Sequence, residues 1–355
     1  MELTLYTPGH GTFMDSLIMY GMASPIPHEE YEIRGSRDFF KITIKDMSLE
    51  NYAEKLRSSI FSKREQMPQL LIDKLKLIQK KSKSRLQEYI DRCMDLNLLT
   101  NELKEYLRPG HAEREGRDCK VRQAQHAWLP LYPHLGKYLT SEFKYPSREY
   151  RVCPSCITLA CLGLVEGSII AQASPLRMNV ILITFEGKIP GRTLSRILTY
   201  VREDEIIRAI GSEKHFRRAA EILPLNAFLG MVFSFFAGDV LAELCYSDAS
   251  FLAESLTFEI SRGVAQIRGY KEIPIDRYLS SLVNLIEKGE GAEHRLRSIL
   301  KMLLDKEEVS AIDAIYLFLT TRRPEDLYKA SRLVAKALEK GFGRDLCRSL
   351  AGIIE

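Results

Sequence analysis

The sequence lacks the motifs that identify most hydrolases and nucleotide-binding enzymes. It contains no nucleophile elbow, no H-E-x-x-H motif, no Walker A loop and no carboxylates paired at a spacing suited to acid–base catalysis. No basic start, apolar core and small-residue cleavage site follow one another at the N-terminus, so we expect no secretory signal. These absences favour a cytoplasmic protein that is not an enzyme.

A strong excess of charge of one sign is also absent. The 51 Lys and Arg residues nearly balance the 47 Asp and Glu residues, which leaves a net charge of +4 over 355 residues. This mild basic excess permits a nucleic-acid partner without demanding one, because a dedicated DNA-binding domain is usually more basic. The seven cysteines are few for this length and odd in number, so we expect reduced thiols.

The longest uncharged, mostly apolar run is the segment Ile222–Gly238, ILPLNAFLGMVFSFFAG. Its length approaches that of a membrane span. However, it contains Pro224 and Asn226, and Asp239 follows at once without a flanking cluster of Lys and Arg. We therefore predict a buried core helix and no membrane partner.

Hydrophobic periodicity predicts an α+β protein that is predominantly helical. Alternating apolar residues predict strands near the N-terminus and a β-hairpin over Ser255–Ile275. From Asp276 onward every pattern is helical, with four or five short amphipathic segments typical of a small bundle. We therefore predict a mixed α+β domain over residues 1–275 and a C-terminal helical bundle over residues 276–355.

Several elements of the first domain have clear limits in the sequence. A strand over residues 1–6 is followed by a Pro/Gly turn and a helix that ends near Ala23. A strand pair is predicted over Tyr31–Asp46, and a buried strand over Asn179–Phe185. The turn that ends the buried strand is predicted at Gly187–Gly191.

The segment Tyr150–Gly167, YRVCPSCITLACLGLVEG, places Cys153 and Cys156 at C-x-x-C spacing before an apolar helix. Two cysteines on one tight turn can supply half of a tetrahedral zinc site. The other ligands would come from the region upstream, where the candidates are His111, Cys119, His126 and His134. A structural zinc ion is thus the one cofactor that the sequence suggests, with Cys153 and Cys156 as its candidate ligands.

Two other interpretations of the same segment stay open. A C-x-x-C pair after a strand and at a helix start is typical of redox chemistry. The corresponding alternative function is a stand-alone enzyme, either a nuclease or a thiol-dependent activity, that uses Cys153 and Cys156. Alternatively, Pro154 occupies the first position of a buried helix, and the cysteines act as small apolar residues.

The turn formed by residues 8–11, PGHG, precedes a predicted helix. Backbone N–H groups at such a turn can meet a phosphate, and the helix N-terminus adds partial positive charge. The alternative is that the glycines serve only a tight turn, because they match no nucleotide-binding motif.

Basic side chains form several modest patches, which are the remaining candidates for a functional site. One lies on a helix, where it could also be a solvated face, and another lies in the loop Arg108–Arg122 close to Trp128. Basic loops beside an aromatic side chain can clamp a phosphate backbone and stack a base. The candidate nucleic-acid-binding residues are Lys80, Lys81, Lys83, Arg85, Arg108, Arg114, Arg117, Lys120, Arg122, Lys188, Arg192, Arg262, Arg268 and Lys271.

Three features together resemble a known family. They are the N-terminal LYTPGHGTFMDSLIMYGMA, the central YRVCPSCITLACLGLVEG and the helical C-terminal region. Over essentially its whole length the chain resembles the large subunit of the archaeal type I-A CRISPR surveillance complex (Cascade). The resemblance implies a non-catalytic subunit in antiviral defence, which helps recognise the protospacer-adjacent motif. The implied partners are other subunits of the CRISPR complex, guide RNA, target DNA and a helicase-nuclease that cuts.

Overall fold

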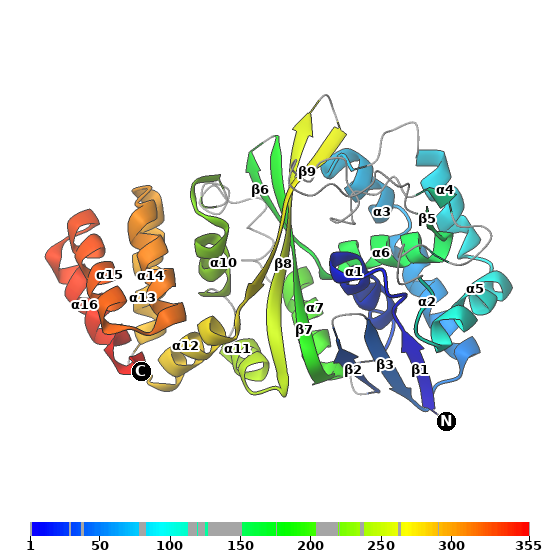
Figure 1. Ribbon diagram of the computed structural model, residues 1–355, viewed down its shortest axis with the longest axis horizontal. Coiled ribbons are helices and arrows are strands. Elements are labelled where there is room, and N and C mark those ends of the chain that lie inside the picture. The colour runs from blue at the N-terminus through cyan, green and yellow to red at the C-terminus, as the bar shows by residue number, and fades with distance from the viewer. Residues whose placement is uncertain are drawn as a thin grey trace. The chain divides into compact units, whose positions relative to one another are not determined.

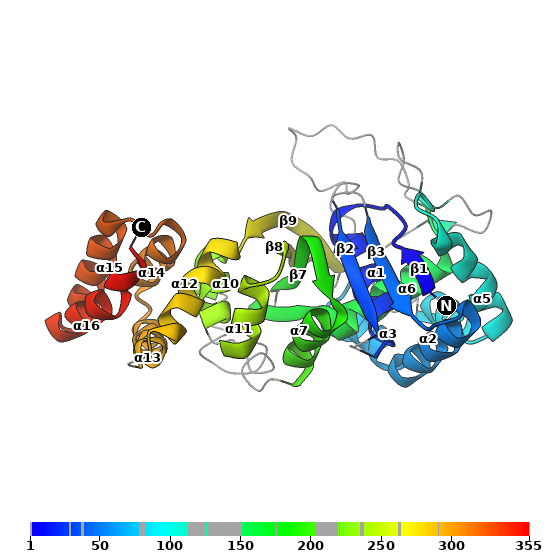
Figure 2. The ribbon, with the colours of Figure 1, turned by 90° about the horizontal axis from the view of Figure 1, so that it is seen from below.

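A computed structural model of the chain describes most of its residues. They are residues 2–27, 30–36, 39–77, 83–112, 119, 125–126, 151–174, 176–203, 219, 221–234, 238–261, 264–289 and 291–354. These residues form many helices and one large sheet (Figures 1 and 2), which confirms the predicted α+β class with its predominance of helix.

The chain divides into two compact units, each built from separate stretches of sequence. Unit 1 comprises Met1–Ile169, Leu176–Arg202 and Glu254–Glu272. Unit 2 comprises Ile170–Pro175, Glu203–Ala253 and Ile273–Glu355. The predicted domain boundary between residues 275 and 276 stays a prediction.

The large sheet has the strand order β1-β3-β2-β7-β8-β9, and β6 also pairs with β7. The register of the N-terminal strands places apolar residues opposite each other, such as Leu5 opposite Ile42. Both of these side chains are fully buried. The strands are β1 (Glu2–Tyr6), β2 (Tyr31–Gly35), β3 (Phe40–Lys45), β6 (Ile169–Ser174), β7 (Arg177–Pro190), β8 (Ala249–Ser261) and β9 (Val264–Pro274).

The predicted strand pairs are present, but the predicted turn at Gly187–Gly191 is wrong. Strand β7 continues through Gly187 to Pro190, and α7 (Gly191–Glu203) follows directly. The reason is pairing with β2, which places Gly187 opposite Gly35 and so extends the ladder. A glycine in the sequence indicated a turn, whereas in the sheet Gly187 takes a φ of 112° within a strand.

Helices α1 (Thr12–Ala23) and α6 (Pro154–Gly167) pack closely against each other in unit 1. Glycines face the partner backbone at the crossing, because a Cβ on Gly21 would lie 2.1 Å from the Leu159 carbonyl oxygen. A Cβ on Gly163 would lie 1.8 Å from the Leu17 carbonyl oxygen. Only glycine permits this approach, and nearly every residue of α6 is buried as a result.

The first turn of α6 is built as the sequence predicts. Cys153 is the N-cap, and its sulfur accepts a hydrogen bond from the backbone N–H of Cys156 at 3.4 Å. Pro154 takes the first helical position, where its missing N–H costs nothing.

Further helices of unit 1 surround this pair, and caps define several of their starts. Ser48 caps α2 by accepting a hydrogen bond from the N–H of Asn51, and Asp95 caps α5. These elements are α2 (Leu49–Lys63), α3 (Gln66–Pro68), the π-helix η1 (Gln69–Lys74), α4 (Lys83–Arg92), α5 (Leu96–Leu103), the 3-10 helix η3 (Lys104–Leu107) and the strand pair β4 (Gln125–His126) and β5 (Arg151–Val152).

Unit 2 contains the predicted buried helix, which is shorter than the apolar segment Ile222–Gly238 from which it was predicted. It is α10 (Leu225–Ser234), and its residues 227–234 are buried; α11 (Gly238–Cys245) follows. Of the helices in the described part of the chain, no single one is long and apolar enough to cross a membrane. Together α10 and α11 meet the length and composition, but as a pair bent by 116°.

The C-terminal region consists of five helices, coloured yellow-orange to red in Figure 1, as the periodicity predicted. Gly343 lies inside α16, where it packs against the Ser331 carbonyl of α15. The helices are α12 (Asp276–Glu287), α13 (Ala292–Asp305), α14 (Val309–Thr321), α15 (Pro324–Ala337) and α16 (Lys340–Leu350), followed by the 3-10 turn η5 (Ala351–Ile353).

The crossing of α1 and α6 yields a stability prediction. We expect Gly163→Ala to lower the free energy of unfolding by about 3 kcal/mol, because the added methyl group collides with backbone that cannot move aside. Gly341→Ala in α16 is the matched control, since nothing lies within 4 Å of its added Cβ, and it should stabilise by up to about 1 kcal/mol. Urea denaturation measures both. Equal midpoints for the two variants would contradict the close crossing.

A buried carboxyl group gives unit 1 a pH-dependent contribution to stability. Glu254 on β8 is 4% exposed, and the Tyr270 hydroxyl lies 3.1 Å from its Oε1. The same hydroxyl donates to Glu272 at 2.5 Å, and its single hydrogen cannot serve both carboxylates at once. Burial, aided by the charge of Glu272, raises the pKa of Glu254 to about 7 from its ordinary 4.5.

The folded protein therefore holds a proton on Glu254 that the unfolded chain releases at lower pH. Its contribution is fully present below pH 4.5 and is lost as the pH rises through about 7. We expect the free energy of unfolding to fall by about 3 kcal/mol over this window, and Glu254→Gln to abolish that fall. Exposed Glu259→Gln on the same strand is the control. An unchanged pH profile for Glu254→Gln, measured by denaturation at each pH, would contradict the assignment.

Candidate metal centre

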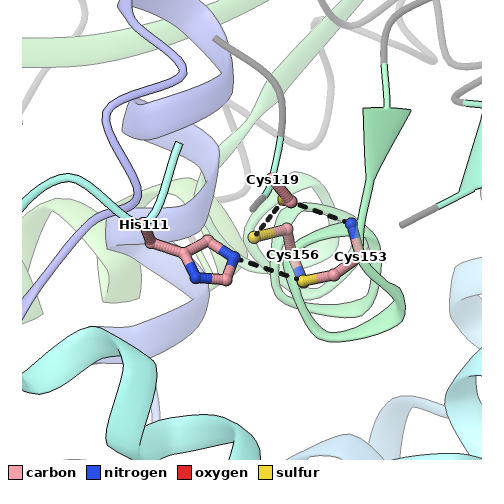
Figure 3. Close-up of side chains that lie close together, drawn as sticks. All are labelled: His111, Cys119, Cys153 and Cys156. Atoms are coloured by element: carbon pink, nitrogen blue, oxygen red, sulfur yellow. Dashed lines mark hydrogen bonds between the residues drawn. The ribbon is translucent and has the colours of Figure 1, made fainter. Parts of the chain in front are cut away.

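Four buried side chains from two stretches of the chain meet in unit 1 (Figure 3). They are His111, Cys119, Cys153 and Cys156, each no more than 6% exposed. Their four ligand atoms all lie within 4.8 Å of one another. The sequence predicted Cys153 and Cys156, and among the described side chains two of the four candidate partners, His111 and Cys119, lie beside them.

The structure does not describe the side chains of the other two candidate ligands. His134 lies outside the described residues. His126 belongs to β4, but its side chain is not among those that the structure describes.

The distances within the cluster fit a tetrahedral zinc ion. A Zn–S bond of about 2.3 Å and a Zn–N bond of about 2.0 Å place two sulfurs about 3.8 Å apart, and a sulfur and a nitrogen about 3.5 Å apart. The Sγ atoms of Cys119 and Cys156 are 3.7 Å apart. The Sγ of Cys153 lies 3.5 Å from Nε2 of His111. The cluster can therefore hold a metal ion without rearrangement of these pairs.

His111 is held by its neighbours in a defined orientation. Its ring stacks on the ring of Tyr106, with centroids 5.0 Å apart, and Nε2 is directed at Cys153. The following residue, Ala112, forms an antiparallel bridge with Cys119 and donates its N–H to the Pro8 carbonyl at 2.8 Å. Nδ1 of His111 is buried and has no hydrogen-bond partner among the residues described here.

The three thiols of the cluster differ in the direction in which their surroundings shift the pKa. Hydrogen bonds from Cys119 and Cys156 lower the pKa of the Cys153 thiol well below its ordinary value. Burial raises the pKa of Cys119 and of Cys156. Hydrogen bonds thus favour the thiolate form of Cys153, whereas burial favours the neutral thiols of Cys119 and Cys156. A divalent cation supplies the charge that allows all three to ionise.

Burial of the cysteines also argues against the redox interpretation of the C-x-x-C motif. A redox pair needs a thiolate that an exchanging thiol can reach. Cys153 is 4% exposed and Cys156 is fully buried. A fully enclosed set of three sulfurs and one imidazole suits a closed, structural metal site better than an exchange centre.

The turn at residues 8–11 is occupied by the chain's own carboxylate. The N–H of Gly9 donates to Asp15 at 3.0 Å, and the N–H of Gly11 donates to the other oxygen of the same side chain. Both glycines have positive φ, 89° and 87°, which a tight turn of this kind requires. The two groups that could have met a phosphate are thus engaged, which favours the purely conformational role of the glycines.

The described members of the predicted nucleic-acid set are exposed, but they lie on separate elements. Lys83 and Arg85 begin α4, and Arg108 follows η3. The remaining exposed members are Lys188 at the end of β7, Arg192 in α7, and Arg268 and Lys271 on β9. Lys80, Lys81, Arg114, Arg117, Lys120, Arg122 and Arg262 lie outside the described residues.

Two of these basic side chains already have acidic partners. Lys188 lies 2.7 Å from Glu32, and Arg268 lies 2.6 Å from Glu259. All four side chains are about half exposed, so each pair contributes little to stability and can exchange its partner.

Sequence patterns missed Tyr106, which borders the cluster. Its hydroxyl lies 3.0 Å from the Sγ of Cys156, and its side chain is 1% exposed. A tyrosine at the end of a helical stretch carries no local signal of such a contact, because the partner is 50 residues away.

Comparison with known proteins identifies the family of the chain. A search among curated proteins gives no match. A family model described as CRISPR-associated protein (Cas_Csa4) matches residues 3–354, which is nearly the whole chain. The match agrees with the CRISPR association expected from the N-terminal and central segments. The chain therefore belongs to the Cas_Csa4 family of CRISPR-associated proteins.

Proposed function

We propose that this protein is a non-catalytic large subunit of a type I CRISPR RNA-guided surveillance complex. In this role it helps recognise the protospacer-adjacent motif and binds target DNA and guide RNA, while a helicase-nuclease partner cuts. The observation that carries the proposal is membership of a CRISPR-associated family over nearly the whole chain.

The distribution of charge supports a role of this kind. In RNA-guided binding, base pairing reads the sequence, and the protein contributes backbone contacts and recognition of a short flanking motif. Such contacts need exposed basic side chains, of which Lys83, Arg108 and Lys271 are examples. The exposed ion pairs Lys188–Glu32 and Arg268–Glu259 supply further cations, because a phosphate can replace a glutamate at little cost.

The mild net charge of +4 also fits a subunit better than a free-standing DNA-binding protein. Non-specific affinity for DNA rises with the number of phosphates that a protein neutralises. A chain with few excess cations binds strongly only when partners and guide RNA add contacts of their own. The separate placement of the exposed basic side chains agrees with contacts shared among subunits.

A structural zinc ion at His111, Cys119, Cys153 and Cys156 is part of the proposal. Four protein ligands complete the tetrahedron and leave no position for a water nucleophile, so the ion would stabilise the fold and not catalyse. In the sequence, His111 and Cys119 stand on either side of Arg114 and Arg117. A metal ion held by both ligands would therefore fix the chain on either side of Arg114 and Arg117, within the predicted DNA-binding loop Arg108–Arg122.

Nucleic-acid binding by the purified full chain tests the proposed role. We expect salt-dependent binding to DNA, and the combined change Arg114→Ala, Arg117→Ala and Lys120→Ala should weaken it at least tenfold. The slope of log affinity against log salt should fall by about 2.7, because three phosphate contacts are lost. Fluorescence anisotropy over a range of salt concentrations measures both quantities.

The matched control changes the acidic residues of the same segment. Glu113→Gln, Glu115→Gln and Asp118→Asn should leave binding unchanged or tighter, since they remove repulsion from phosphate. Equal affinity of the basic triple variant and the unmodified chain would contradict the assignment of this segment. DNA cleavage by the chain alone, abolished by Cys153→Ala, would contradict the non-catalytic role.

The zinc proposal predicts a metal-dependent stability. We expect one zinc ion per chain by elemental analysis, and Cys156→Ser should lose it. At free zinc 1,000-fold above Kd, metal binding stabilises by about 4 kcal/mol, so a chelator should lower the unfolding midpoint of the unmodified chain. Cys347→Ser, at an exposed cysteine of α16, is the control and should keep both metal and stability. A metal-free native protein that a chelator leaves unaffected would contradict the site.

A further inference from the structure

A zinc ion bound by three thiolates and one neutral imidazole carries a net charge of −1. All four ligands are buried, and an unbalanced charge in a protein interior is costly. Sites of this kind are stabilised by donors that hydrogen-bond to the ligating atoms from outside the coordination sphere. The chain should therefore supply N–H and O–H groups to the sulfurs.

Each of the three sulfurs has such a donor. The backbone N–H of Cys156 donates to Cys153 at 3.4 Å, and the backbone N–H of Cys153 donates to Cys119 at 3.2 Å. The Tyr106 hydroxyl lies 3.0 Å from Cys156. Two of these donors come from the α6 turn itself and one from η3.

Cys119 has a second neighbour, from a part of the chain remote in sequence. Nε2 of His10 lies 3.6 Å from the Cys119 sulfur, and His10 is fully buried. A metal-bound thiolate has no hydrogen to give, so a hydrogen bond between these atoms needs the proton on Nε2 of His10. His10 does not belong to the four side chains whose ligand atoms lie within 4.8 Å of one another, so it stands outside the coordination sphere.

The turn that carries His10 is fixed from both sides. The carboxylate of Asp15 accepts hydrogen bonds from the N–H groups of Gly9 and Gly11, the two residues that flank His10. The carbonyl of Pro8 accepts the N–H of Ala112, which follows the ligand His111. The imidazole is thus presented to Cys119 by a rigid turn that is itself bonded to the ligand segment.

We propose that His10 is an outer-shell positioning residue of the metal centre, which donates its Nε2–H to the Cys119 thiolate. The inference rests on the proposed zinc site and goes beyond it, because it adds the N-terminal turn to that site. It also gives the PGHG turn a role: Gly9, Gly11 and Asp15 hold one imidazole in place.

Cobalt titration of the metal-free full chain tests the inference, since Co²⁺ reports its ligands through thiolate charge-transfer and d–d bands. The informative pair is His10→Gln and His10→Met, which have similar size, but only Gln keeps an N–H donor. We expect His10→Met to bind Co²⁺ and Zn²⁺ 10–100-fold more weakly than the unmodified chain, and His10→Gln to recover most of the affinity. Both variants should keep the unmodified absorption spectrum, because the four ligands are unchanged.

Two reference variants frame the result. His111→Ala should alter the Co²⁺ spectrum, since it removes a ligand, and His294→Ala, at an exposed histidine of α13, should change nothing. Equal affinities of His10→Met and His10→Gln would overturn the inference and leave the metal site standing. A changed spectrum in both would also overturn it, by making His10 a ligand. Failure of the unmodified chain to bind Co²⁺ would overturn the metal site itself.

Discussion

The close contact of α1 and α6 is the constraint on which the candidate metal centre depends. Gly21 and Gly163 let the two backbones touch, and α2, α3 and α4 also contact α6, so this helix is buried along nearly its whole length. Its first turn, with Cys153 and Cys156, is buried with it. Sulfurs in such a position are protected from exchange with other thiols, and they are available for a metal that the fold encloses.

Local features of the fold were predictable, and contacts between distant segments were not. Pro154 at the first position of α6, the Ser48 cap and the C-terminal helices follow from signals within a few residues. The sequence also named His111 and Cys119 as candidates, but it could not choose between them and two other histidines. The extension of β7 past Gly187 required its partner β2, and no local pattern carries that information.

For the candidate metal site, too, the residue types were predictable from the sequence, whereas their surroundings were not. Residue types and the C-x-x-C spacing suggested zinc, because thiolates and imidazole are its preferred ligands. Burial, which favours a metal site over a redox pair, arises from tertiary structure, as do the contacts of the Tyr106 hydroxyl and the His10 imidazole with the sulfurs. The exposed basic residues were predictable as types, whereas their placement on separate elements emerges only from the fold.

The central claim is that this Cas_Csa4 family member acts as a subunit of an RNA-guided complex. The most direct measurement is isolation of the tagged chain from its native host, with mass spectrometry of the proteins and sequencing of the RNA that co-purify. The account predicts recovery of other CRISPR complex subunits together with guide RNA. Recovery of the chain alone, without nucleic acid, would contradict it.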